Sequence, residues 1–154
     1  MKAIKWTVAL AALVVVAVGT HHMASAEDKA DALASIKCPV SGKAVKAAST
    51  ADHNGGKVYF CCNNCPKAFA KNTAKFSAAA NHQLAATGQA KLSKCVFTGK
   101  KLNPATKIDV AGVAIRFCCN GCKGKATKVS GKDQIALLFG DAKFAKGYVV
   151  GKKK

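Results

Sequence analysis

Small apolar residues form an uninterrupted run from Thr7 to Gly19, and a mixed pattern of polar and apolar positions follows it. Lys2 and Lys5 precede the run and small residues occupy 24–26, as in a secretory signal peptide with a small-x-small cleavage site. The run is shorter than the roughly 18 residues that a membrane-spanning helix needs. We therefore expect residues 1–26 to be a signal peptide and the mature protein to be periplasmic or secreted.

Two short segments, 58–61 and 115–118, are rich in β-branched and aromatic residues, which favour strands. The first follows Asn-Gly-Gly at 54–56, a strong signal for a hairpin turn, and the second follows Ala-Gly at 111–112, a weaker one. The pattern therefore predicts a β-hairpin in each of these two regions.

A helical pattern of apolar residues follows each predicted hairpin. Asn63 and Asn120 mark the expected helix starts, because an asparagine side chain can accept hydrogen bonds from the free N–H groups of a first turn. Beyond them, apolar residues share one helical face that we expect to be buried. These residues are Phe69, Phe76, Ala80 and Leu84 after the first hairpin, and Ile135, Leu138, Phe139 and Ala142 after the second.

An internal repeat accounts for both regions. When residues 37–71 are laid over 94–128, an offset of 57, thirteen positions are identical and all eight cysteines fall into register. Chance alignment of four cysteines at once is improbable. We therefore divide the mature chain into a first unit, 27–93, and a second unit, 94–154.

The cysteines suggest what stabilises units this small. A natural domain of under 70 residues often needs a disulfide or a metal ion, because its apolar core is small. Both units have the spacing Cys-x22-Cys-Cys-x2-Cys, with one cysteine at a glycine-containing turn and the others where a strand leads into a helix. That spacing is typical of a treble clef. We expect an α+β fold of two small tandem treble-clef-like units, each a β-hairpin followed by helix.

The first unit resembles the YHS domain. The resemblance rests on Cys38-Pro-Val-Ser-Gly, on Val-Tyr-Phe-Cys-Cys-Asn-Asn-Cys at 58–65, and on Phe69 and Phe76. The second unit is similar, with Arg-Phe-Cys-Cys-Asn-Gly-Cys at 116–122. The wider cysteine spacing resembles the TRASH domain. The resemblance implies a role in the trafficking, resistance or sensing of heavy metals.

The turns of both units also resemble the treble clef of an archaeal ribosomal protein, in which the turn carries two cysteines. Ser41 and Thr98 stand where its second turn cysteine would be, so each unit has three clear thiolate donors. Cys62 or Cys119 is a fourth only if the chain has already turned, since adjacent side chains of a strand point to opposite faces. Three thiolates suit copper(I), and four suit zinc. The candidate ligands for zinc or copper(I) are Cys38, Cys61, Cys62, Cys65, Cys95, Cys118, Cys119 and Cys122.

A disulfide-stapled, cationic interaction module without metal is the alternative, because an even number of cysteines in an exported protein often forms disulfides. The close clustering of the cysteines favours metal, since neighbours such as Cys61 and Cys62 pair only under strain. We do not expect an enzyme, because no separate acid–base constellation accompanies the thiols and Glu27 is the only glutamate. His53 and His82 have no histidine counterpart in the other unit, and we expect both on the solvated surface, with an accessory ligand role for His53 as the alternative.

The formal charge of the whole chain is +18, and it becomes +16 without the signal peptide, which carries two lysines and no acid. Arg116 is the only arginine, whereas nucleic-acid recognition leans on arginine and stacking aromatics, so we expect no nucleic-acid partner. The scattered lysines indicate a solvated surface that could associate weakly with an anionic membrane surface or acidic polymers. The sequence identifies a metal ion as the expected ligand and identifies no protein partner.

Overall fold

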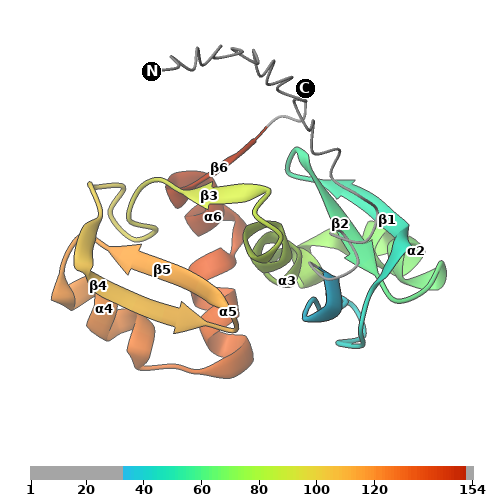
Figure 1. The fold of residues 1–154 in the computed structure, drawn as a ribbon, viewed down its shortest axis with the longest axis horizontal. Coiled ribbons are helices and arrows are strands. Elements are labelled where there is room, and N and C mark those ends of the chain that lie inside the picture. The colour runs from blue at the N-terminus through green and yellow to red at the C-terminus, as the bar shows by residue number, and fades with distance from the viewer. Residues whose placement is uncertain (1–32, 152–154) are drawn as a thin grey trace, which may run out of the picture.

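The computed structural model describes residues 33–151, and it has a mixed α+β fold in which a hairpin–helix arrangement occurs twice (Figure 1). This confirms the predicted fold class. The predicted signal peptide lies outside the described residues. Within residues 33–151, no helix combines the length and the apolar character needed to cross a bilayer. The elements of the first unit are β1 (Lys46–His53), β2 (Gly56–Phe60), α2 (Asn64–Lys71), α3 (Thr73–Ala86) and β3 (Ala90–Leu92). Those of the second unit are β4 (Asn103–Val110), β5 (Val113–Phe117), α4 (Asn120–Thr127), α5 (Gly131–Phe139), α6 (Asp141–Gly147) and β6 (Tyr148–Val150).

Both hairpins close through the turns that the sequence predicts. Each turn has two central residues with positive φ, as the type I′ turn of a two-residue hairpin requires. The φ angles are 47° and 81° at Asn54 and Gly55, and 49° and 83° at Ala111 and Gly112. Ala111 adopts a left-handed conformation that alanine rarely takes, which explains why this turn has the weaker sequence signal.

Each hairpin also has an irregular register close to the cysteines. The shift falls between Lys46 and Thr50 in the first hairpin and between Asn103 and Ile108 in the second. Thr106 is buried at this shift, and its Oγ1 bonds to both the carbonyl oxygen and the N–H of Phe117, at 2.7 and 2.9 Å. This hydroxyl therefore fixes the end of β5, from which Cys118 follows.

The helices are shorter than the apolar pattern predicts. Asn72 interrupts the first, because its backbone leaves the helical region (φ −147°, ψ 63°) and its side chain accepts a hydrogen bond from Lys75 N at 3.3 Å, which starts α3. Phe69 therefore belongs to α2 and not to the helix of Phe76. In the second unit α5 ends before Gly140, and Ala142 lies exposed in α6. The prediction of two continuous helical faces is thus wrong, although most of the predicted core residues are buried.

The predicted helix starts are correct to within a residue, but the predicted capping is not seen. Asn63 and Cys119 are the N-cap residues of α2 and α4, and neither side chain caps its helix. The Asn63 side chain instead accepts a hydrogen bond from the Ser49 hydroxyl at 2.5 Å. The asparagine therefore joins the start of α2 to β1.

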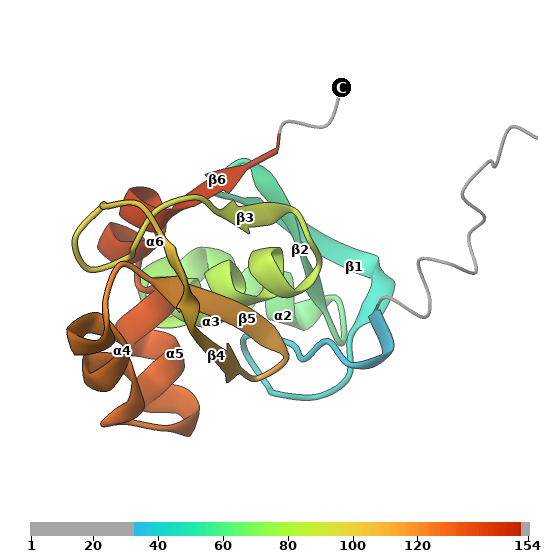
Figure 2. The ribbon, with the colours of Figure 1, turned by 60° about the vertical axis from the view of Figure 1, so that its left-hand side comes forward.

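The two units share a small sheet and a helix pair. β3 and β6 are the last strands of their units, and they pair antiparallel with Lys91 opposite Val149. α3 and α5, the equivalent long helices, pack against each other beneath this pair (Figure 2). Equivalent strands of the two units thus pair antiparallel, and equivalent helices pack together.

Asn81 on α3 forms the polar centre of this junction. It is fully buried, and both atoms of its amide are hydrogen-bonded. Its Nδ2 donates to Phe139 O and to Asp141 Oδ1, both at 2.9 Å, while its Oδ1 accepts from Asn54 Nδ2 at 2.8 Å and lies 3.0 Å from His53 Nε2. One side chain thus ties the first hairpin to the corner between α5 and α6.

His53 and His82 are half-buried, so the expectation of two solvated surface histidines is wrong. His53 packs edge-on against Phe69 with ring centroids 5.3 Å apart. His82 lies 4.9 Å from the Phe139 ring, and its Nε2 is 3.0 Å from Val110 O. Burial lowers the pKa of both histidines. The second unit covers His82 through a contact between distant parts of the chain, which the local pattern around this residue does not reveal.

Candidate metal centre

A tight turn positions the first cysteine of each unit. Cys38 N donates to Lys43 O and Gly42 N donates to Cys38 O, both at 2.8 Å. The second unit repeats this turn around Cys95, with distances of 2.9 and 2.7 Å. Gly42 and Gly99 have φ angles of 72° and 70°, a region that favours glycine, which explains the matching glycines of the repeat. The same hydrogen-bonded turn thus fixes the backbone of the first cysteine in both units.

The second and third cysteines come from the junction of strand and helix. Cys61 follows the last residue of β2, and Cys65 lies in the first turn of α2. Cys118 and Cys122 have the same places relative to β5 and α4. Because β2 and β5 end beside the turns, the three thiols of each unit meet. The two trios are Cys38, Cys61 and Cys65, and Cys95, Cys118 and Cys122; within each, the sulfur atoms all lie within 4.8 Å of one another.

The spacing of the sulfur atoms fits a single metal ion. A Zn–S distance of about 2.3 Å places the corners of a tetrahedral site about 3.8 Å apart. The Cys61 and Cys65 sulfurs are 3.6 Å apart, and those of Cys118 and Cys122 are 3.7 Å apart. The first and third cysteines of each trio are buried and the middle one is half-buried. The trios are therefore already close to the geometry that a soft ion requires, and each could hold one.

Ser41 and Thr98 each contact the middle thiol of a trio. The Ser41 hydroxyl is 3.1 Å from Cys61 Sγ, and the Thr98 hydroxyl is 3.2 Å from Cys118 Sγ. The turn N–H groups of Lys43 and Lys100 point back to these hydroxyls at 3.4 and 3.3 Å. The sequence indicates that these residues are poor metal ligands, but it does not predict their hydrogen bonds to the sulfurs. The presence of a hydroxyl residue at the same place in both units is the signal that could have predicted these hydrogen bonds.

The local environment gives the three thiols different acidities. Burial raises the pKa of Cys38, but hydrogen bonds from the Ser41 hydroxyl and from backbone N–H groups outweigh burial and lower this pKa from 9.0 to about 7. The same balance lowers the pKa of Cys95 to about 6. Burial, followed by hydrogen bonds with neighbouring thiols, raises the pKa of Cys65 and of Cys122 to about 12. A bound metal ion would therefore displace a proton from the third cysteine of its trio.

Cys62 and Cys119 lie beside the trios and differ from them in exposure. Both are exposed, and neither belongs to the sets of three mutually close sulfurs. The Cys62 sulfur is 3.5 Å from that of Cys65, whereas the Cys119 sulfur is 3.8 Å from that of Cys118. Backbone N–H groups at the helix start lower the pKa of both exposed thiols. All eight cysteines are free thiols.

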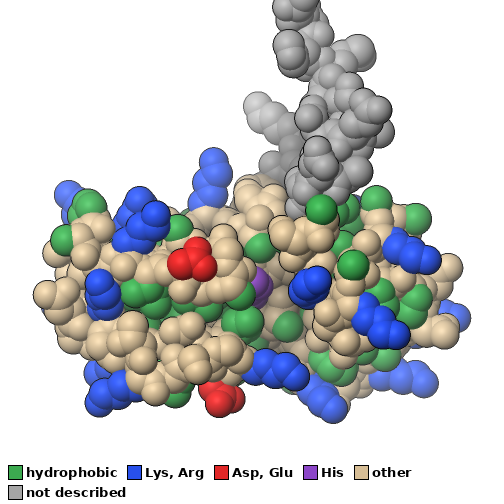
Figure 3. Space-filling view, turned by 60° about the horizontal axis from the view of Figure 1, so that its bottom comes forward, with side chains coloured by type: hydrophobic (Ala, Val, Ile, Leu, Met, Phe, Trp, Pro, Cys, Tyr) green, Lys and Arg blue, Asp and Glu red, His purple; other side chains and the backbone are tan. Residues whose placement is uncertain are grey.

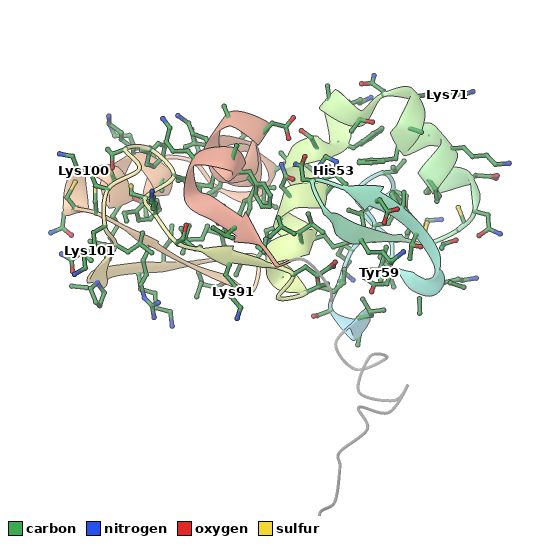
Figure 4. All side chains as sticks on the ribbon, turned by 90° about the horizontal axis from the view of Figure 1, so that it is seen from above. His53, Tyr59, Lys71, Lys91, Lys100 and Lys101 are labelled. Atoms are coloured by element: carbon green, nitrogen blue, oxygen red, sulfur yellow. The ribbon has the colours of Figure 1, made fainter. Side chains whose placement is uncertain are left out.

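The two trios are separate sites. Sulfur atoms lie toward both ends of the long axis, one group in each unit (Figure 4). His53 is labelled between them, on the hairpin of the first unit, and neither trio contains a histidine. The accessory ligand role considered for His53 therefore finds no support in the geometry of these sites.

Basic side chains lie on the surface of both units. Lys and Arg side chains are spread over both halves of the face in Figure 3, with few acidic side chains among them. In the described part of the chain, Lys57 and Asp52 form the one ion pair, at 3.7 Å. The surface is thus cationic without a single concentrated patch on this face.

Comparison with protein-family models, with curated proteins and with solved structures found no match to this chain.

Proposed function

We propose that this is an exported metal-binding protein that buffers, carries or senses copper or zinc, with one ion held in each unit. The observation that carries the proposal is the pair of cysteine trios at equivalent positions, each with its sulfur atoms within 4.8 Å of one another. The repeated cysteine pattern and its resemblance to the YHS and TRASH domains support the same function. The thiols of both trios serve as metal ligands in this function, so we propose a binding protein and not an enzyme.

The number of donors favours copper(I). Each trio supplies three thiolates, and soft thiolate ligands select copper(I), whereas a closed structural zinc site takes four donors. Ser41 and Thr98 are neutral hydroxyls that hydrogen-bond to a sulfur of the trio and are poor ligands for zinc. Zinc would need Cys62, Cys119 or a water molecule as its fourth ligand. We therefore propose a three-thiolate copper(I) site in each unit, with zinc as the second choice.

Elemental analysis with a thiol count tests this proposal on protein recovered from the compartment to which it is exported. We expect two metal ions per chain and eight reduced cysteines, and we expect a chelator that removes the ions to reduce the stability of the fold. Protein that carries neither metal nor free thiols would contradict the proposal and favour the disulfide-stapled alternative.

Matched variants assign the ions to the trios. Replacing all three members of one trio by serine should remove one ion and leave the other unit loaded. The exposed cysteines provide the control, because replacing both by serine should leave two ions bound if the trio is sufficient. The two trio variants change Cys38, Cys61 and Cys65, or Cys95, Cys118 and Cys122, and the control changes Cys62 and Cys119.

A further inference from the structure

Cys62 and Cys65 form a Cys-x-x-Cys pair at the start of α2, and the two thiols differ in access to solvent. Cys62 is exposed, whereas Cys65 is buried with 8% of its surface accessible. Their sulfur atoms are 3.5 Å apart. An exposed thiol next to a buried thiol is the arrangement in which one sulfur can meet an external disulfide and the other can complete an internal one.

The backbone between these cysteines already has the shape that a disulfide needs. Cys65 N donates to Cys62 O at 3.2 Å, which closes a four-residue turn. The ends of such a turn lie less than about 7 Å apart at their Cα atoms. The usual Cα separation across a disulfide is about 4.4–6.8 Å. The bond can therefore form mainly by rotation of the two side chains.

We propose that Cys62 and Cys65 form a reversible disulfide, which makes the first unit a redox-responsive site that withdraws Cys65 from its trio. The co-reactant is a small disulfide such as oxidised glutathione. The Cys62 thiolate attacks one sulfur of this disulfide, a mixed disulfide forms, and one thiolate leaves. The Cys65 sulfur then attacks Cys62 Sγ, and the second thiolate leaves and takes up the Cys65 proton. Two protein thiols are oxidised, and one external disulfide is reduced to two thiols.

The second unit lacks this arrangement despite the same spacing. Its N-cap, Cys119, has an extended backbone (φ −158°, ψ 168°), and its carbonyl oxygen accepts from Lys123 N at 3.1 Å and not from Cys122 N. Cys119 Sγ lies 3.8 Å from the sulfur of the adjacent Cys118, and it also interacts with the Cys122 thiol, but without the turn that brings Cys62 and Cys65 together. A disulfide between adjacent cysteines is strained. The second unit is therefore the internal control for the first.

The consequence for metal rests on the proposed function. Cys65 is a member of the first trio, so a disulfide that includes it leaves two donors in that site. Oxidation should release the ion of the first unit and spare that of the second. The disulfide itself can be detected whether or not any metal binds, so the redox chemistry and the metal function can fail separately.

The experiment treats the reduced full chain with oxidised glutathione, metal-free in one arm and loaded with zinc in the other. In the metal-free arm, we expect mass spectrometry to place a disulfide between Cys62 and Cys65, with a peptide lighter by two hydrogen atoms. In the zinc arm, we expect loss of half of the bound metal. Dithiothreitol should restore the thiols and the binding.

Two single variants complete the test. Cys62→Ser should abolish the disulfide of the first unit, so that the zinc this variant binds before oxidation stays bound after it. Cys119→Ser should still form the disulfide and release zinc from the first unit on oxidation. Both residues are exposed, so circular dichroism should show that both variants fold. Absence of the Cys62–Cys65 disulfide under oxidation, or equal metal loss from Cys62→Ser and Cys119→Ser, would overturn the proposal. A disulfide in a chain that never binds zinc or copper(I) would sustain the redox site and refute the proposed function.

Discussion

Replacing Asn81 by alanine tests whether one buried amide holds the two units together. The variant removes hydrogen bonds with Phe139 O, Asp141 Oδ1, Asn54 and His53. Asn54 and Asp141 are exposed and His53 is half-buried, so these three partners can bond to water instead. Their loss should cost about 1 kcal/mol together, because the net contribution of a replaceable hydrogen bond is small.

The loss of stability in Asn81→Ala depends mostly on the carbonyl group of Phe139. Phe139 is fully buried, and its bond to Asn81 Nδ2 lies in the interior. An unpaired buried acceptor costs about 1–3 kcal/mol. We therefore expect Asn81→Ala to reduce the free energy of unfolding by about 3 kcal/mol. That is a large part of the stability of a small protein.

Urea unfolding followed by circular dichroism measures this change. The variant and the unaltered chain must be compared at the same metal loading, because a bound ion stabilises the folded state by mass action. Asn64→Ala is the matched control, since Asn64 is exposed, and it should change the stability by less than about 0.5 kcal/mol. A loss below about 1 kcal/mol for Asn81→Ala would refute the reasoning, because it would mean that the Phe139 carbonyl finds another partner.

Three further predictions concern packing, pH and surface charge. A Cβ atom on Gly56 would lie 2.7 Å from Leu84 Cδ2, so Gly56→Ala should destabilise the fold by about 1–3 kcal/mol in urea unfolding. Gly124 lies in an open part of α4, so Gly124→Ala should stabilise the fold by up to about 1 kcal/mol. The opposite order would refute the close contact. Burial lowers the pKa of His82 below 6.5, so the folded state favours the neutral ring; stability is full above about pH 6.5 and should fall as the pH drops toward the lowered pKa. His82→Gln should flatten this dependence, and an equal slope in both proteins would refute it. The cationic surface should bind anionic lipid vesicles weakly at low salt and release them as salt rises, and binding that does not depend on salt would contradict an electrostatic origin.

The cysteine trios are the part of the structure that the sequence predicts best. The glycine turn, the strand end and the helix start are each set by residues close to one another in the chain, and the repeat displays each twice. Gly42 and Gly99 are required by their positive φ angles, so this turn can be read directly from the sequence. The residues of both trios are therefore among the predicted ligands.

Features that depend on contacts between distant residues could not be predicted. β3 and β6 are each three residues long; β3 has no strand pattern, and the Tyr-Val-Val of β6 does not reveal that β3 is its partner. Asn81 looks like an ordinary polar helix residue until Phe139 and Asp141 are placed beside it. The helix breaks at Asn72 and Gly140 are also not predicted, because the apolar pattern continues across both positions. The local signals at these positions are weaker than the packing that overrides them.

The central claim is that each unit binds one metal ion through three cysteine sulfurs. X-ray absorption at the metal edge, on exported protein with its native metal, tests this claim most directly because it reports the number and distance of sulfur neighbours. We predict a shell of three sulfur atoms at about 2.3 Å around the metal. Replacing either trio by serine should halve the metal content of the protein. A metal shell of nitrogen and oxygen without sulfur, or protein isolated with its cysteines in disulfides and no metal, would contradict the account.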